Sequence, residues 1–195
     1  MITLVIIGVI AALTVPTVMN KINEQRTVSG VKTAYSKLAQ AIQKAQISNG
    51  SLTTWSVDSP EDIFKLVKPN LQIMKECGYG SGCFPDVTYK YLDNREYINI
   101  DTRGDIYKFI LNDGTLVVIL IHRNKQGMNF WFDINGPKGP NQWAKDLFLF
   151  PVDFTTGKIS VTDNSYECYK DNTGLGCAGW ILKYNNTDYP ATTPE

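Results

Sequence analysis

The chain opens on an apolar run that no charge interrupts. Residues 1–19 (MITLVIIGVIAALTVPTVM) contain no Asp, Glu, Lys or Arg, and the first charge is Lys21. A membrane-spanning helix needs about 20 apolar residues, so the run is nearly a complete span. It has neither the basic start nor the small-residue cleavage site of a signal peptide. We predict a membrane or assembly helix that uses Leu4, Ile6, Ile7, Gly8, Ile10, Leu13 and Pro16.

After Pro16 the pattern is that of an amphipathic helix. Apolar side chains recur at steps of three and four, while basic and amide side chains fall on other faces. Asn49 and Gly50 provide a left-handed stop, so one helix is predicted over residues 1–48, bent at Pro16 because proline leaves a carbonyl without its partner. The apolar seam consists of Val28, Val31, Tyr35, Leu38, Ile42 and Ala45.

Beyond Gly50 the pattern changes to strands and turns. Ser59 can cap a short helix that begins at Pro60 and runs to about Val67. The clearest hairpin joins residues 106–111 to residues 115–121 through Asn-Asp-Gly. Further strands are predicted at 129–134 and 147–150, with weaker candidates at 159–162 and 180–184.

A long helix followed by antiparallel hairpins predicts an α+β fold in which the helix lies across one face of the sheet. We predict an N-terminal helix over residues 1–50, apolar over 1–19 and amphipathic over 20–48. A globular head, residues 51–195, then has about 145 residues, enough for its own core. The tail after Tyr189 is expected to be disordered.

The charge distribution argues against nucleic acid as a partner. The 195 residues include 19 basic and 19 acidic side chains, and 43% of them are hydrophobic. Five basic residues and one acidic residue precede position 45, so a basic helix joins a mildly acidic head. No block of like charge is dense, and aromatic residues are not interleaved with Lys or Arg.

Four cysteines form two close pairs, Cys77 with Cys83 and Cys168 with Cys177. The even count and the glycine-containing loops between partners favour two short-range disulfides and an oxidising compartment. Of the three possible connectivities we prefer this local one from loop geometry. Zinc is the alternative, but structural zinc sites usually have closer cysteine pairs, and the single histidine, His122, is not suitably spaced.

The N-terminal stretch ITLVIIGVIAALTVP, with TVMNKINEQ and VSGVKTAYSKLAQAI after it, resembles the prepilin-type segment of type IV pilins and type II secretion pseudopilins. The loop ECGYGSGCFP, the NDGT turn, DINGPKGPN with KDLFLF, and GWILKYNNTDY are similar to the heads of a bacterial pseudopilin-like subfamily. The resemblance therefore covers nearly the whole chain. In that family a basic leader is cleaved between Gly and Phe, the new N-terminus is methylated, and a glutamate follows. These residues would lie upstream of Met1, so we expect the sequence to be truncated.

The resemblance implies a structural subunit, a pseudopilin or minor pilin of a type II secretion or type IV pilus-like filament, and not an enzyme. Its expected partners are other subunits through the N-terminal helix, the inner-membrane assembly platform and membrane lipid. The expected location is the bacterial cytoplasmic membrane, crossed once, with the head outside the cytoplasm, and a periplasmic or cell-surface filament after assembly. The alternatives are a membrane-anchored exported binding domain that does not polymerise and a secreted enzyme.

Three further features have less specific interpretations. Asp133, Asn135 and Asp146 are oxygen donors of the kind that hold calcium, but Pro137 and Lys138 break the EF-hand pattern, which favours an Asx-rich turn. His122 has no second histidine and no nucleophile elbow near it, so a strand-end histidine is expected and a hydrolase triad has no support. Alternation along the strands predicts that the aromatic residues form core and not a ligand groove. These are Phe130, Trp131, Phe132, Trp143, Phe148 and Phe150.

Overall fold

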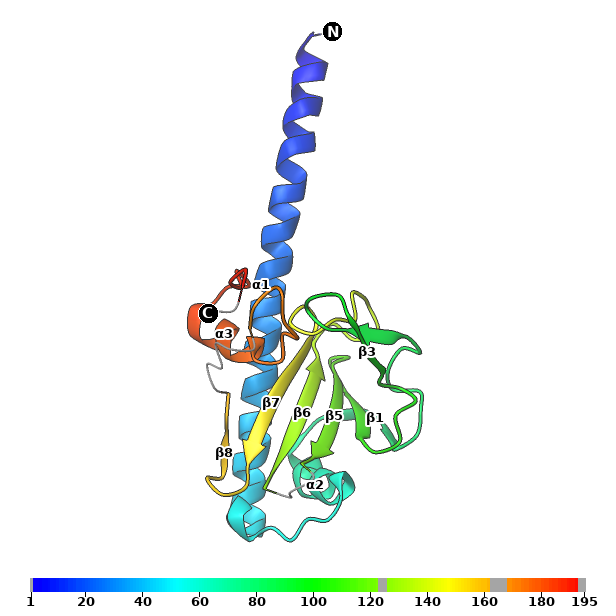
Figure 1. Cartoon of the computed structure of the whole chain (residues 1–195), viewed down its shortest axis with the longest axis vertical. Helices are drawn as coiled ribbons and strands as arrows, with labels where there is room; N and C mark the ends of the chain where they lie inside the picture. Colours follow the sequence, from blue (N-terminus) through cyan, green and yellow to red (C-terminus); the bar gives the residue numbers. More distant parts are fainter. Residues whose placement is uncertain (1, 123–125, 162–167, 193–195) are drawn as a thin grey trace.

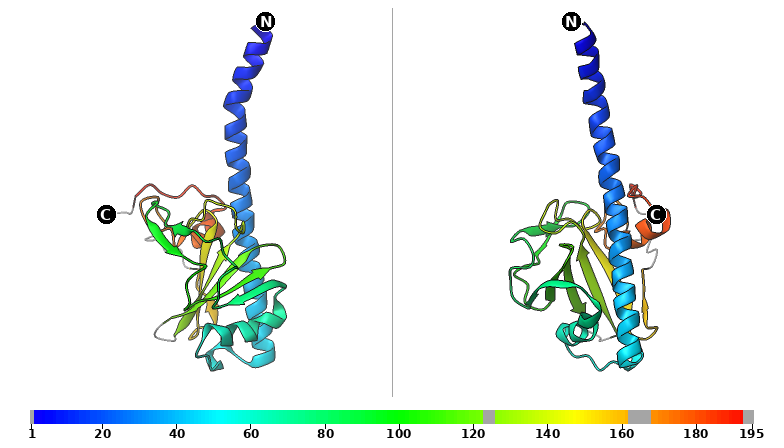
Figure 2. Two further views of the ribbon diagram at one scale, coloured as in Figure 1. Left: turned by 90° about the vertical axis from the view of Figure 1, so that its right-hand side faces the viewer. Right: turned by 180° about the vertical axis from the view of Figure 1, so that it is seen from behind.

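One long helix, α1 (Ile2–Asn49), runs the length of the molecule and extends well beyond the rest of it (Figure 1). A computed structural model describes residues 2–122, 126–161 and 168–192, with side chains from residue 14 onward. The helix of 48 residues is about 72 Å long at 1.5 Å per residue. It continues through Pro16, and Figure 2 shows a gentle curve in its projecting part.

The C-terminal end of α1 has the predicted stop. Gly50 adopts a φ of 81°, a left-handed conformation that glycine reaches without a steric penalty. The side-chain nitrogen of Asn49 donates to the Ala45 carbonyl at 2.9 Å, which satisfies one of the terminal carbonyls. The helix predicted over residues 1–48 is thus confirmed, with its last residue one position later.

The head contains a six-stranded antiparallel sheet in the order β1-β4-β5-β6-β7-β8. Its central hairpin was predicted, with Phe109 paired to Val117 across the turn. Strands β2 and β3 form a separate antiparallel pair. The bounds are β1 (Ile73–Gly78), β2 (Thr88–Lys90), β3 (Glu96–Asn99), β4 (Tyr107–Leu111), β5 (Leu116–Ile121), β6 (Gly127–Asp133), β7 (Leu147–Asp153) and β8 (Lys158–Ile159).

Both faces of the central strands are buried, and alternate residues supply two separate cores. Phe130 and Phe132 of β6 face α1, whereas Trp131 between them faces away. The α1 side contains Val31, Leu38, Ile42 and Ala45 of the predicted seam, while Val28 and Tyr35 pack at its edge. The segment from Cys83 to Ile106, which includes β2 and β3, covers the opposite face.

The α+β architecture with a helix across one sheet face is therefore confirmed. Figures 1 and 2 show the C-terminal half of α1 lying along the sheet and its N-terminal half standing clear of it. Helix α2 (Pro60–Val67) begins as predicted, with Ser59 and Asp62 forming a reciprocal capping box. Two short 3₁₀ turns, η1 (Leu52–Thr54) and η2 (Lys68–Asn70), flank this helix.

One strand prediction is wrong: residues 180–184 belong to helix α3 (Cys177–Tyr184). The run Trp-Ile-Leu is rich in strand formers, but it is too short to distinguish the helical period of about 3.6 residues from the strand period of about two. In the fold Ala178 and Ile181, three apart, are both buried against the α1 side. The rings of Trp180 and Tyr184, four apart, lie 4.3 Å from centroid to centroid, and Asn185 ends the helix with a φ of 59°.

The remaining elements differ from the predictions at their ends. The weak candidate at 159–162 corresponds to β8, which pairs with the end of β7, and Thr162 lies outside the described residues. The tail was expected to be disordered after Tyr189, but Pro190 still accepts the Lys170 N–H at 2.9 Å. Residues 193–195 are outside the described part of the chain.

Candidate functional site

The end of α1 that projects beyond the head, residues 2–21, carries exposed apolar side chains; we call it the projecting segment. Every described side chain in it, from Thr14 to Lys21, is exposed. Val15, Val18 and Met19 retain 58%, 55% and 48% of their accessible surface. Large apolar side chains gathered on one surface mark a place that a protein or a lipid covers.

Most of the residues predicted to form the membrane or assembly helix are described only by their backbone. Of that set, Pro16 has a described side chain, which is exposed. The side chains of Leu4, Ile6, Ile7, Gly8, Ile10 and Leu13 lie outside the described residues, although their backbone is part of α1. Among the residues whose side chains the structure describes, from Thr14 onward, no helix has the length and apolar character needed to cross a bilayer.

Three contacts fix α1 to the head close to the projecting segment. Gly30 lies so near Ile134 that a Cβ on Gly30 would be 2.8 Å from the Ile134 Cδ1 atom. One turn earlier, the Thr27 hydroxyl donates to the Lys145 carbonyl at 3.4 Å. Another turn earlier, the Glu24 carboxylate accepts the Thr187 N–H at 3.1 Å. Loops distant in sequence therefore meet on one side of the helix.

A cleft of ≈ 1070 Å³ lies between α1 and these loops. Residues 20–27 of α1 supply one wall, while the loop after β6 and the segment after α3 supply much of the other. Buried Tyr189 is part of the lining, and its hydroxyl donates to the Ala144 carbonyl at 2.8 Å. Burial raises the pKa of Tyr189, so this donor stays protonated at neutral pH.

Buried hydrogen bonds hold the cleft loops in place. The Gln142 side-chain amide donates to the carbonyls of Tyr91 and Leu92 at 2.7 and 3.1 Å. The Asp146 carboxylate accepts the backbone N–H groups of Asn141 and Gln142, both at 2.6 Å. A loop tied by buried charge-assisted bonds keeps one conformation. The hydrogen bonds of Gln142 and Asp146 therefore hold the head wall of the cleft in one conformation.

The oxygen donors considered for calcium, Asp133, Asn135 and Asp146, belong to the same group of hydrogen-bonded loop residues. Asp133 is fully buried, and its carboxylate accepts the Tyr89 hydroxyl at 2.6 Å and the Asn135 N–H at 3.3 Å. The second bond makes the predicted Asx turn. Among the described residues no group of three or more His, Cys, Asp or Glu side chains could hold a metal ion.

Asp133 and Asp146 are both buried carboxyl groups, and their protonation is coupled. Burial, together with the charge of Asp146, raises the pKa of Asp133 to about 8. Burial also raises the pKa of Asp146. Burial and the Asp133 charge raise the pKa of Tyr89. The Tyr89 hydroxyl therefore stays protonated and donates the hydrogen bond to Asp133. Asp133 thus gains a proton on folding at neutral pH.

Both disulfides have the preferred local connectivity. Cys77 is bonded to Cys83 and Cys168 to Cys177, with Cα–Cα distances of 5.9 and 4.7 Å. All four cysteines are therefore bridged, and the zinc alternative is set aside. The first disulfide closes a loop at the end of β1, and the second fixes the start of α3.

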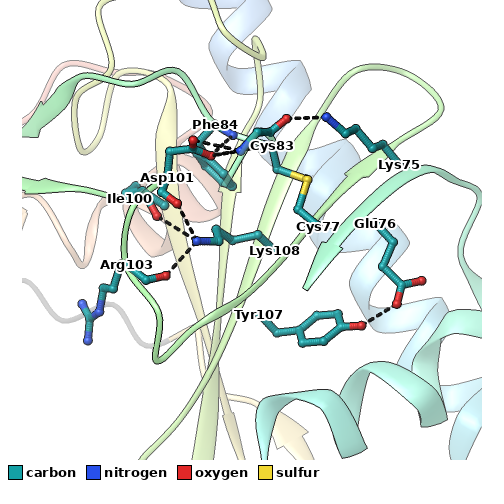
Figure 3. Close-up of a disulfide and its surroundings, with 11 residues drawn as sticks. Lys75, Glu76, Cys77, Cys83, Phe84, Ile100, Asp101, Arg103, Tyr107 and Lys108 are labelled. Carbon is teal, nitrogen blue, oxygen red and sulfur yellow. Dashed lines mark hydrogen bonds between the residues drawn. A yellow bond between two sulfur atoms is a disulfide. The ribbon is translucent and has the colours of Figure 1, made fainter. Parts of the chain in front are cut away.

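A buried carboxylate organises the Cys77–Cys83 loop (Figure 3). The Asp101 carboxylate accepts the backbone N–H groups of Gly82, Cys83 and Phe84, with a shortest distance to each of 2.8, 3.1 and 2.9 Å. Successive N–H groups that converge in this way form an anion-binding nest. Lys75 donates to the Gly82 carbonyl at 2.7 Å from the other side.

A buried lysine completes the same arrangement. The Lys108 ammonium of β4 donates to the carbonyls of Asp101 and Arg103, both at 2.7 Å, and to that of Ile100 at 3.4 Å (Figure 3). Burial lowers the pKa of Lys108. The lysine satisfies carbonyls of a loop that has little regular structure, which is a structural role.

The other candidate residues belong to the core or to a strand end. His122 follows β5, and its Nε2 atom lies 2.8 Å from the Asn129 Oδ1 atom. The aromatic side chains predicted to be core are all buried, which confirms that prediction: Phe130, Phe132, Phe148 and Phe150 on the α1 side, and Trp131 and Trp143 on the other.

Sequence reasoning missed the polar residues that hold the head loops together. Lys108 carried a usable signal, because it is a single charge inside the otherwise apolar strand YKFIL, whose two faces are buried. Asp101 and Glu24 gave none, since their partners are backbone groups 17 to 163 positions away. The cleft itself is lined by five stretches of the chain that only the fold brings together: residues 20–27, 92–94, 134–145, 170 and 187–189.

Comparisons with known proteins identify a family but no activity. The model of DUF6613, a family of unknown function, matches residues 17–169. This match includes the packed part of α1, the whole sheet and the first disulfide. No curated protein matches the chain, and no solved structure matches it.

Proposed function

The chain belongs to the DUF6613 family, whose function is unknown, and from its own residues we propose that it is a structural subunit of a pilus-like or secretion-type filament. In this proposal the subunit is a pseudopilin or minor pilin of a bacterial type II secretion or type IV pilus-like system. It waits in the cytoplasmic membrane, crossed once by the N-terminal helix, with the head outside the cytoplasm. It acts by assembly and not by catalysis.

The observation that carries the proposal is the projecting segment. The seam of α1 that packs on the sheet begins near Val28, and the described side chains nearer the N-terminus than Ile22 are exposed. Yet the sequence there is apolar on every face up to Met19. A helix apolar all round is stable in lipid or among other apolar helices. A filament subunit meets both environments, lipid before assembly and the helices of other subunits after it.

The disulfides and the sequence resemblance support the same proposal. Two bridges are typical of a domain that folds in an oxidising compartment, outside the cytoplasm. The resemblance to the prepilin-type segment covers the projecting segment and continues into the packed part of α1. Gly8, Ala11 and Ala12 are small enough to let neighbouring helices approach closely.

A membrane-anchored exported domain that does not polymerise is the second candidate. The seam of α1 already buries its apolar side chains within one chain, so the fold is complete without a neighbour. The projecting segment then serves only as an anchor. Both candidates predict that the protein is retained in the membrane. Only the filament subunit needs small residues on the helix, because they let the helices of neighbouring subunits approach closely.

Two substitutions separate these possibilities in cells that express the full chain. Ile7→Asp should release the protein from the membrane fraction, since an acidic side chain in mid-span costs roughly 2.5–3.5 kcal/mol, whereas Ile7→Leu should leave it there. Gly8→Leu should preserve membrane retention and abolish the ladder of cross-linked subunits that filaments give. Membrane retention of Ile7→Asp would refute the anchor. No ladder in the unsubstituted chain would favour the non-polymerising domain, whereas an unchanged ladder in Gly8→Leu would show that Gly8 takes no part in the helix contact between subunits.

A further inference from the structure

The cleft between α1 and the head has an excess of positive charge. Four cationic side chains line it and all are exposed: Arg26 on α1, and Lys138, Lys145 and Lys170 on the head. None of the four forms an ion pair with a carboxylate of the described residues. These charges come from three separate segments, which the fold directs into one space.

The acidic side chain in the lining, Glu24, does not balance these charges. Its carboxylate accepts the Thr187 N–H, so it serves to connect α1 to the C-terminal segment. The other polar lining groups are neutral amides and hydroxyls, among them Asn20, Asn23 and Thr27. Cations flanked by neutral donors are the chemistry that binds phosphate and other oxyanions.

The position of the cleft along α1 indicates where such an anion would come from. The apolar run ends at Met19, and the helical wall of the cleft begins at Asn20 and ends at Thr27. At 1.5 Å per residue this wall covers about 12 Å of helix directly after the run. The headgroup layer occupies about 5–8 Å on each side of the hydrocarbon core. A helix that buries its apolar run in lipid therefore holds the cleft beside the headgroups.

We propose that this cleft binds the phosphate groups of anionic phospholipids while the subunit is held in the membrane. The inference rests on the proposed insertion of α1. Headgroups held by Arg26 on one wall and by lysines on the other fix the depth and the rotation of the head at the bilayer surface. Leaving the membrane for a filament then requires these contacts to be exchanged for others. Each cation near an anionic surface strengthens binding about fivefold.

Lysine footprinting of the full chain in lipid nanodiscs tests the proposal. The chain is inserted into discs of phosphatidylcholine alone and of phosphatidylcholine with increasing phosphatidylglycerol, and an amine-reactive reagent labels exposed lysines. Phosphatidylglycerol should reduce the labelling of Lys138, Lys145 and Lys170 severalfold. Lys44 and Lys65, which are exposed elsewhere, should label equally in both kinds of disc.

A charge-removal variant measures the strength of the site. In Lys138→Gln/Lys145→Gln, about 25-fold more phosphatidylglycerol should be needed to protect Lys170 to half its maximum, because two cations are lost. The matched control Lys32→Gln/Lys44→Gln removes two exposed lysines of α1 outside the cleft and should leave the midpoint unchanged. Retention of both disulfides and of the melting temperature shows that the variant is folded.

The other outcomes each decide against the proposal in a different way. A chain that does not enter the discs overturns the membrane function and this inference together. A chain that enters while its cleft lysines label equally in both lipids overturns the inference alone. Equal protection by millimolar inorganic phosphate in phosphatidylcholine discs would assign the cleft to a soluble anion. Protection that rises with chain-to-disc ratio in phosphatidylcholine would assign it to a second copy of the chain.

Discussion

Gly30 of α1 and Ile134 of the loop after β6 approach so closely that a Cβ on Gly30 would be 2.8 Å from the Ile134 Cδ1 atom and 3.2 Å from its Cβ atom. This contact lies between the packed half of the helix and the cleft. Glycine is a poor helix former, so its presence within α1 has a packing reason. The close approach sets the distance between the helix and the head wall of the cleft.

Enlarging Gly30 should therefore separate the helix from this loop. We expect Gly30→Val to lower the free energy of unfolding by about 1–3 kcal/mol, the cost of overpacking. Gly30→Ala should change it by less than about 1 kcal/mol, because gained helix propensity offsets a clash that the end of the Ile134 side chain can relieve. Urea unfolding measures both. Ser29→Val, on the exposed side of the same turn, is the control, and an equal loss there would contradict the packing account.

The buried carboxyl of Asp133 should make the head less stable as the pH rises. Its folded-state pKa is raised to about 8, above the value of about 3.9 expected in the unfolded chain. Between these values the folded state holds a proton that the unfolded state has released, so stability falls with pH by up to about 1.4 kcal/mol per unit. The stabilisation that protonated Asp133 contributes is therefore fully present below about pH 4 and lost by about pH 8.

Asp133→Asn should flatten this dependence, since an amide keeps an acceptor for the Tyr89 hydroxyl but does not titrate. Urea unfolding at pH 5, 6 and 7 compares the slopes. Asp153→Asn, an exposed carboxyl whose hydrogen bonds to Thr155 lower its pKa, is the control and should leave the slope over this range unchanged. Equal slopes for the Asp133→Asn variant and the unsubstituted chain would refute the assignment.

Removing the Lys108 ammonium should open the loop that it supports. Lys108→Met keeps most of the side-chain volume but leaves the carbonyls of Asp101 and Arg103 buried without their donor. We expect a loss of about 2–4 kcal/mol in the free energy of unfolding, as each unsatisfied group costs about 1–3 kcal/mol. Lys32→Met, on the exposed face of α1, should be neutral. Faster amide exchange at residues 82–84 would report the loosened nest; unchanged exchange would argue that Asp101 holds it alone.

The Cys77–Cys83 bridge and the Asp101 nest should each compensate in part for loss of the other. Cys77→Ser/Cys83→Ser should cost about 2 kcal/mol on the chain-entropy account of a small loop. Asp101→Asn should cost more in that background than in the bridged protein, because the carboxylate then orders Gly82 and Cys83 without covalent help. A double-mutant cycle measures the coupling, for which about 0.5 kcal/mol or more is expected between groups in contact. Strict additivity would show that the two devices act independently.

Local sequence signals predicted the structure correctly where it depends on residues that are close together in the chain. The capping box at Ser59, the stop at Gly50 and the Asn-Asp-Gly hairpin each depend on a few adjacent residues. The seam of α1 depends on a period that spans only one helix. Strand β1 was missed because it is a bulged edge strand with much exposed surface and little alternation.

Residue order alone was enough to predict the helical continuity of residues 2–49, the apolar character of the projecting segment, the hairpin strands and the local pairing of the cysteines. The helical state of residues 177–184, the buried roles of Asp101 and Lys108, and the cleft where α1 leaves the head became visible only in the folded chain. The difference lies in the range of the interactions. Helix period, caps and turns are set by groups a few residues apart, whereas a buried charge or a lined cleft exists only after distant segments have excluded water together.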